Sequence, residues 1–137
     1  RKWLVHLDVM TRRVLEVGNC DYDHRTLAAV LSAQFSASVI RAHGISDALG
    51  ALEQATAEHT RFDLVLVNRL MDRDGAEGIE IIRAIQRDPR FQATPVMMIT
   101  NFEEHQRRAT AEGAVPGFGK AQVHAAQTQE TLRPYLA

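Results

Sequence analysis

The sequence has little of several features that define common protein classes. A single cysteine, Cys20, among 137 residues excludes a disulfide within the chain and is typical of a reducing compartment. No apolar run approaches the roughly 20 residues that span a bilayer, and no signal-peptide pattern occurs, so we expect a cytoplasmic protein without membrane contact. Sixteen Lys and Arg residues face seventeen Asp and Glu residues, a formal net charge of -1, which argues against direct binding to nucleic acid.

Motifs of the common enzyme and metal-binding classes are also missing. The sequence contains no Gly-rich phosphate loop, no nucleophile elbow and no His-Glu-x-x-His zinc motif. Its six histidines include no pair at ligand spacing, and one cysteine is too few for a structural zinc site. We therefore expect no enzymatic activity and no protein-bound metal.

The hydrophobic pattern predicts one α/β domain. The chain is 45% hydrophobic and 24% charged, and its length suits a single core. Short apolar runs of strand length alternate with amphipathic segments of helix length, which is typical of a parallel sheet covered by helices. The predicted strands are residues 14–17, 37–42, 62–67, 95–99 and 115–118.

Each predicted strand is followed by a predicted helix. The helices are expected to begin at Tyr22 or Asp23, at Ser46, after the loop 68–78, at Glu103 and at Gln122. Ser46 is a favourable N-cap, Gly113 is a favourable helix end, and Pro134 is expected to stop the last helix.

Five such units indicate a flavodoxin-like (βα)5 three-layer sandwich with strand order 2-1-3-4-5, whose functional site lies at the carboxyl ends of the strands. Residues 12–137 would form this domain. Residues 1–11 do not fit the count, and we interpret them as an N-terminal extension, either a tail or an arm that packs on this domain or on a second subunit.

The residues around the predicted strand ends carry a resemblance to a known family. Over roughly residues 12–136 the chain resembles the receiver (CheY-like) domain of bacterial two-component response regulators. The resemblance depends on five stretches that occur in the expected order, namely residues 14–31, 62–67, 78–82 and 95–100, and the pair Gly113 and Ala114 ahead of Lys120.

The resemblance implies a phosphorylation site, and this sequence departs from it at the reaction centre. In such receivers two acidic residues after strand 1 and the aspartate that ends strand 3 hold Mg²⁺; that aspartate accepts the phosphoryl group, while a hydroxyl and a lysine bind its oxygens. Position by position, the acidic pair falls on Gly18 and Asn19, the acceptor on Asn68, the hydroxyl on Thr100 and the lysine on Lys120. An amide does not serve as the nucleophile, and Mg²⁺ prefers carboxylate oxygens. We therefore expect Mg²⁺ binding to be lost.

Further departures follow the same direction. Gly117 stands at the aromatic switch position of strand 5, Ala121 replaces the usual proline, and the loop after Asn68 is about two residues longer than in the family. The leading hypothesis is a degenerate pseudo-receiver that acts in signal transduction without phosphorylation. Its partner would be another signalling protein or an effector domain, with a homodimer through the fourth helix, fifth strand and last helix as one arrangement.

Two other functions remain open at this point. The domain could be an active phosphoacceptor that uses the displaced carboxylate of Asp72 or Asp74, or a sensor that binds a small ligand in the emptied acidic pocket.

Several of these residues also have a purely structural interpretation. The Thr100 hydroxyl could cap a backbone group, Lys120 could be a solvated surface residue, and Asp21 and Asp23 suit the first turn of a helix. Glu16, inside a central strand, would need a buried partner such as a lysine or arginine.

Overall fold

The computed structural model describes residues 11–137 and contains one parallel sheet of five strands. The order of the strands is β2-β1-β3-β4-β5, which confirms the prediction. Most of the predicted N-terminal extension, residues 1–11, lies outside the described residues. The strands are β1 (Arg13–Val17), β2 (Ser38–Ala42), β3 (Leu64–Asn68), β4 (Val96–Ile99) and β5 (Val115–Phe118).

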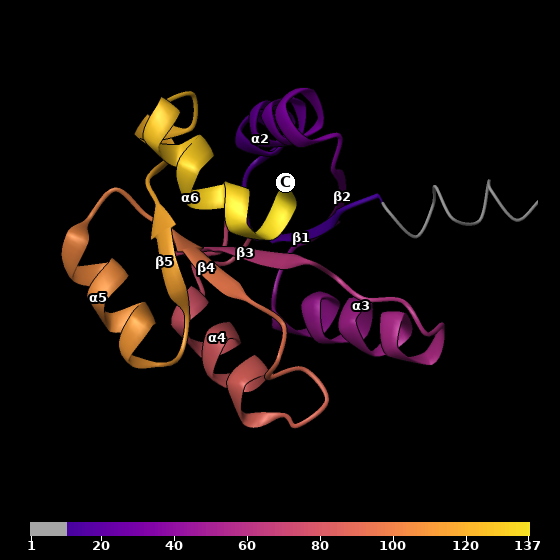
Figure 1. Cartoon of the computed structure of the whole chain (residues 1–137). Coiled ribbons are helices and arrows are strands. Elements are labelled where there is room, and N and C mark those ends of the chain that lie inside the picture. The colour runs from indigo at the N-terminus through magenta and orange to yellow at the C-terminus, as the bar shows by residue number, and fades with distance from the viewer. Residues whose placement is uncertain (1–10) are drawn as a thin grey trace, which may run out of the picture.

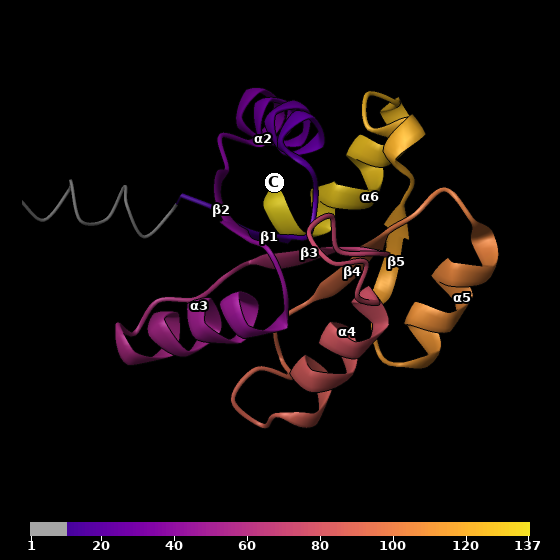
Figure 2. The same ribbon diagram turned by 180° about the vertical axis from the view of Figure 1, so that it is seen from behind.

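Helices cover both faces of the sheet, as the three-layer prediction requires. Figure 1 shows α2 and α6 on one face and α3, α4 and α5 on the other, and Figure 2 shows the same layers from behind. No helix in the described part of the chain is long and apolar enough to cross a membrane. The helices are α2 (Asp21–Phe35), α3 (Ile45–Ala57), α4 (Gly78–Arg87), α5 (Glu103–Ala111) and α6 (Ala126–Leu136), with a short 3-10 helix η1 (Lys120–Gln122) before α6.

The central strand β3 packs into a separate apolar core on each face of the sheet. Val65 and Val67 belong to the core under α3, α4 and α5, whereas Leu64 and Leu66 belong to the core under α2 and α6. All four side chains are fully buried. Each such burial contributes about 1.5–3 kcal/mol, so the apolar run that predicted this strand also fixes it at the centre of the domain.

Two helices begin earlier than the sequence predicted. Helix α2 begins at Asp21, because the Cys20 sulfur accepts a hydrogen bond from the Asp23 backbone amide at 3.5 Å and acts as the N-cap. Helix α3 begins at Ile45, after Gly44, and the expected cap at Ser46 is wrong. The carboxylate of Asp47 instead accepts a bond from the His43 backbone amide at 3.2 Å, and this contact holds the chain that enters the helix.

The last helix also differs from the prediction, because α6 starts later and continues through Pro134. A proline in the last turn lacks only one helical donor, and the Arg133 carbonyl still accepts a bond from the Ala137 amide at 3.0 Å. Leu132 and Leu136 are buried and hold this turn against the sheet. Burial of the apolar side of the helix therefore outweighs the effect of the proline.

A carboxyl group is buried in the middle of the sheet. Glu16 of β1 is 0% exposed and lies on the α2 side, where it contacts Nδ1 of His24 and accepts a hydrogen bond from Nδ2 of Asn19. The expected lysine or arginine partner is therefore wrong. Arg41, opposite Glu16 on β2, instead binds the Asp21 carboxylate at 2.8 Å and donates to the Asn19 carbonyl at 2.9 Å.

The contact between His24 and Glu16 yields a test. We predict that His24→Ala lowers the free energy of unfolding by about 1–3 kcal/mol, because it leaves part of a buried carboxyl group without a partner. The measurement is urea denaturation at neutral pH. His124→Ala is the matched control, since His124 is exposed and should be replaceable without effect. Equal stability of His24→Ala and the wild type would show that Asn19 alone satisfies Glu16.

Candidate functional site

The carboxyl ends of β3, β4 and β5 bring three of the predicted site residues together. Asn68, Thr100 and Lys120 line one depression at this edge of the sheet. Gly18, at the end of β1, is joined to it through its carbonyl oxygen, which accepts a hydrogen bond from Asn68. Asn19 differs, because its amide turns toward Glu16. The depression therefore collects three of the six predicted positions, and Gly18, Asn19 and Gly117 do not line it.

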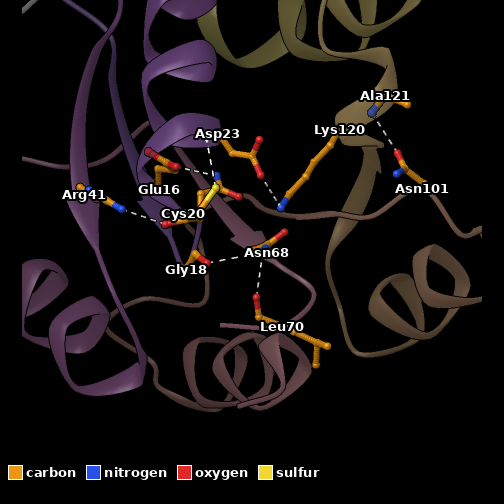
Figure 3. A network of polar contacts seen from close by, with 11 residues as sticks. Glu16, Gly18, Cys20, Asp23, Arg41, Asn68, Leu70, Asn101, Lys120 and Ala121 are labelled. Carbon is orange, nitrogen blue, oxygen red and sulfur yellow. Dashed lines mark hydrogen bonds and ion pairs between the residues drawn. The ribbon is translucent and has the colours of Figure 1, made fainter. Parts of the chain in front are cut away.

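The Asn68 side chain is used as a hydrogen-bond donor. Its Nδ2 donates to the Leu70 carbonyl at 2.7 Å and to the Gly18 carbonyl at 3.4 Å, as Figure 3 shows. These two bonds connect the end of β3 with the loop that follows it and with the loop after β1. A carboxylate, which only accepts hydrogen bonds, could make neither of them.

Gly18 is packed against a methionine from the loop after β3. Its φ of +91° is a conformation that side chains disfavour, and a β-carbon added there would lie 2.5 Å from Cε of the buried Met71. The backbone amide of Asp72 donates to the Gly18 carbonyl at 2.9 Å and brings this loop over the residue. Met71 therefore occupies the space into which an acidic side chain at position 18 would extend.

The residues present do not fit a magnesium ion. The three positions that the family resemblance assigns to carboxylates hold a glycine, an amide bound to Glu16 and an amide bound to two carbonyls. Within residues 11–137 no group of three or more His, Cys, Asp or Glu residues is placed to hold a metal ion. Hard divalent cations need such anionic oxygens.

The displaced carboxylates that sequence reasoning kept open lie on the exposed part of the loop between β3 and α4. Asp72 and Asp74 are both exposed. The Asp74 carboxylate accepts a hydrogen bond from the Ala76 backbone amide at 2.9 Å, which closes a local turn. The loop is further closed by a backbone bridge between Leu70 and Glu77. Neither aspartate belongs to the depression that contains Asn68 and Lys120.

Lys120 is engaged with an acidic residue of α2. Its Nζ lies 2.8 Å from Oδ2 of Asp23, and both side chains are about one third exposed, at 37% and 31%. Figure 3 shows the lysine extended away from Ala121 toward α2. The hydrogen bond from Lys120 holds the pKa of Asp23 below its ordinary value. Asp23 thus has a partner that its expected role in the first turn of the helix did not predict.

Thr100 has the structural role that the sequence left open. The residue is buried, and its hydroxyl oxygen accepts a hydrogen bond from the Phe102 backbone amide at 3.3 Å. Its own backbone amide donates to the Phe118 carbonyl at 3.0 Å. The hydroxyl therefore shapes the turn that leads into α5 while it still borders the depression.

Gly117 is tied to α5 by a glutamine that sequence reasoning missed. A β-carbon at Gly117 would collide with the Met98 carbonyl oxygen, so no side chain fits at this position of β5. Nε2 of Gln106 donates to the Met98 carbonyl at 2.8 Å, and the Gly117 amide donates to Oε1 of Gln106 at 3.1 Å. In the sequence, the only sign of this contact is that Gln106 lies one turn after the start of the predicted helix.

Sequence comparison identifies the family at this point. The profile described as the response regulator receiver domain matches residues 21–120. The chain belongs to this family. The match begins after Gly18 and Asn19, the two positions from which the acidic pair is missing. No curated protein is similar enough in sequence to count as a relative.

Solved structures of receiver domains share the fold. The signal receiver domain of a DNA-binding response regulator from Colwellia psychrerythraea 34H has a TM-score of 0.73 and 21% identity, with 90% of this chain and 96% of that one covered. The chemotaxis protein CheY4 of Vibrio cholerae has a TM-score of 0.68 and 22% identity, over 92% and 99% of the two chains. The phosphorylated cyanobacterial phytochrome response regulator RcpA has a TM-score of 0.72 and 17% identity, over 93% and 95%.

The hydrogen bonds of Asn68 lead to a prediction. We expect Asn68→Asp to lower the free energy of unfolding by about 1–3 kcal/mol, because the carboxylate would face two carbonyl oxygens without a proton to donate. Asn101→Asp is the matched control: Oδ1 of Asn101 accepts from the Ala121 amide at 3.0 Å, and a carboxylate would keep that bond. Urea denaturation of both variants at neutral pH is the measurement. A more stable Asn68→Asp protein would contradict the assigned amide orientation.

The ion pair of Lys120 gives a prediction in pH. Because the pKa of Asp23 is lowered, the pair stabilises the fold above the ordinary pKa of an aspartate, and this contribution is lost as the pH falls through the lowered value. Lys120→Met should therefore raise the Asp23 pKa toward its ordinary range, measured by carboxyl NMR titration. The stability difference from wild type, about 1 kcal/mol or less for so exposed a pair, should disappear in acid. The lowered pKa of Asp21, whose partner is Arg41, should not change and is the internal control.

Proposed function

We propose that this receiver domain signals without phosphorylation, by binding another signalling protein or an effector domain. Membership in the receiver family makes it a module of signal transduction. The further step, from receiver to pseudo-receiver, rests on one observation. The space in which the family resemblance places the acidic cluster is taken up by other side chains of this chain and their hydrogen bonds. Under this proposal the domain has no enzymatic activity and holds no Mg²⁺.

The filling of the site supports the proposal more strongly than the missing carboxylates alone. Met71 stands against Gly18, and the Asn68 amide is bound to two backbone carbonyls. These contacts join the end of β3, the loop that follows it and the loop after β1 into one packed unit. A phosphoryl group attached here would have to separate them. Two cationic side chains, Lys120 and Arg69, border the depression, and Lys120 is already paired with Asp23.

The route by which a receiver transmits phosphorylation is also altered. In the family the signal depends on the hydroxyl and on a mobile aromatic residue of strand 5, and here that aromatic position is Gly117. Gln106 bonds to the neighbouring strands in its place. A surface that does not rearrange on phosphorylation can still bind a partner, always in the same conformation. Phe102, which is 60% exposed at the start of α5, is an apolar contact point on the face proposed for a partner or a second copy.

The rival function, an active phosphoacceptor at Asp72 or Asp74, is separated from this proposal by a direct assay. We expect no addition of phosphate when the chain is incubated with acetyl phosphate and Mg²⁺ and its intact mass is measured. A receiver that keeps its three carboxylates, treated in parallel, is the positive control.

The outcome against the proposal has a defined signature. A stoichiometric gain of one phosphate that is abolished by Asp72→Asn or by Asp74→Asn would assign the chain to the active receivers. Asp47→Asn, at an exposed aspartate of α3 far from this loop in the sequence, is the matched control for nonspecific phosphorylation of surface carboxylates and should not change the result.

A further inference from the structure

A second cavity lies beside the candidate site, between α2 and the segment that joins β5 to α6. Its volume is about 210 Å³, and its wall is apolar where Leu27, Ile99 and Phe118 contribute. Asn19, Asp23 and Lys120 supply polar groups to the same wall. Gly18, Asn68 and Thr100 do not line it, and this cavity adjoins the depression at the ends of the strands, with which it shares Ile99 and Lys120.

One polar atom of a residue that lines this wall lacks a partner. Asn19 is 2% exposed, and its Oδ1 is buried without a hydrogen bond to any described residue. The orientation of the amide is fixed, because its Nδ2 donates to the buried Glu16 carboxyl group. A buried acceptor without a donor costs about 1–3 kcal/mol. Together with the nearby Asp23 carboxylate, it favours a ligand that brings an N–H donor.

The ion pair at the cavity supplies one charge of each sign. Lys120 and Asp23 are bonded to each other at 2.8 Å, yet each is about one third exposed, so the pair contributes little stability. A ligand with both an ammonium and a carboxylate could replace this contact and leave neither charge unpaired. A ligand with only one of the two groups would leave Asp23 or Lys120 without its partner.

We propose that the cavity binds a free α-amino acid with an apolar side chain. The ammonium group meets Asp23 and the Asn19 oxygen, the carboxylate meets Lys120, and the side chain packs on Leu27, Ile99 and Phe118. The small volume excludes larger cofactors and suits a metabolite of this size. The inference is independent of the proposed function, because a pseudo-receiver and an active receiver could both contain such a site.

The test is calorimetric titration of the full chain with leucine, valine, methionine and phenylalanine at millimolar concentration. We expect at least one of them to bind. Isocaproate, which lacks the ammonium of leucine, and isopentylamine, which lacks the carboxylate, should bind about tenfold or more weakly, because each leaves a charged partner unpaired. Equal binding of isocaproate would mean that the site recognises only an anion and would overturn the proposal.

Variants assign the binding to this cavity. Asp23→Asn and Lys120→Gln should each weaken binding by about tenfold or more, and Val123→Phe, which adds volume to the wall without a change of charge, should abolish it. Glu130→Gln and Arg133→Gln, at an exposed ion pair of α6 outside the cavity, are the matched controls and should bind like the wild type. Amide NMR spectra show whether each variant is folded.

Three further results would overturn the proposal. The first is the absence of binding by every amino acid of the panel. The second is wild-type affinity in folded Asp23→Asn or Val123→Phe protein. The third is binding of N-acetyl-leucine amide as tightly as leucine, since this compound represents a leucine within a protein and would assign the cavity to a side chain of a partner.

Discussion

The buried carboxyl group of Glu16 is the constraint on which the site depends. It lies on the interior strand β1, where it is fully buried, and it is satisfied by His24 from α2 and by Asn19 from the loop between β1 and α2. A buried charged or polar group without partners is costly, so this loop has to present a donor at position 19. An aspartate there would place a second carboxylate against Glu16. The presence of Glu16 in the strand and the absence of an acidic residue at position 19 are therefore consequences of one packing arrangement.

The other site positions show the same pattern, in which packing contacts stand where the family has charged side chains. Carboxylates gathered at a strand edge repel one another unless a cation holds them. In this chain Gly18 and Asn68 carry no charge, and the loop after β3 is able to close over them with Met71 and the Asp72 amide. Lys120, which in an active receiver would face a phosphoryl oxygen, has turned to Asp23 of α2. Gly18, Asn68 and Lys120 thus each make a contact that holds the loops of the domain together.

The order of the strands and the residues at the strand ends could be predicted from the sequence, because both follow from local patterns. The run of Val and Leu residues in β3 fixes a central strand, and the chain direction then places Asn68, Thr100 and Lys120 on one edge. The contacts of these residues could not be predicted. The pair between Lys120 and Asp23 joins residues 97 positions apart, and Glu16 meets His24 only because α2 packs on the side of the sheet where Glu16 lies. The predicted helix boundaries were wrong where tertiary contacts decide them. Burial of Leu136, for example, extends α6 past Pro134.

The two sides of Lys120 suggest where regulation remains available in this domain. On the side of β4 and β5, Gln106 bonds to Met98 and Gly117, and no side chain fits at Gly117 to move in response to the depression. These bonds of Gln106 do not involve Asn68, so a change of charge at Asn68 would not remove them. On the side of α2, Lys120 is held only by a partly exposed ion pair beside a cavity with an unsatisfied acceptor. A ligand that separates this pair would act on α2 and on the segment before α6. A signal through Lys120 would therefore reach α2 and α6, and not α5.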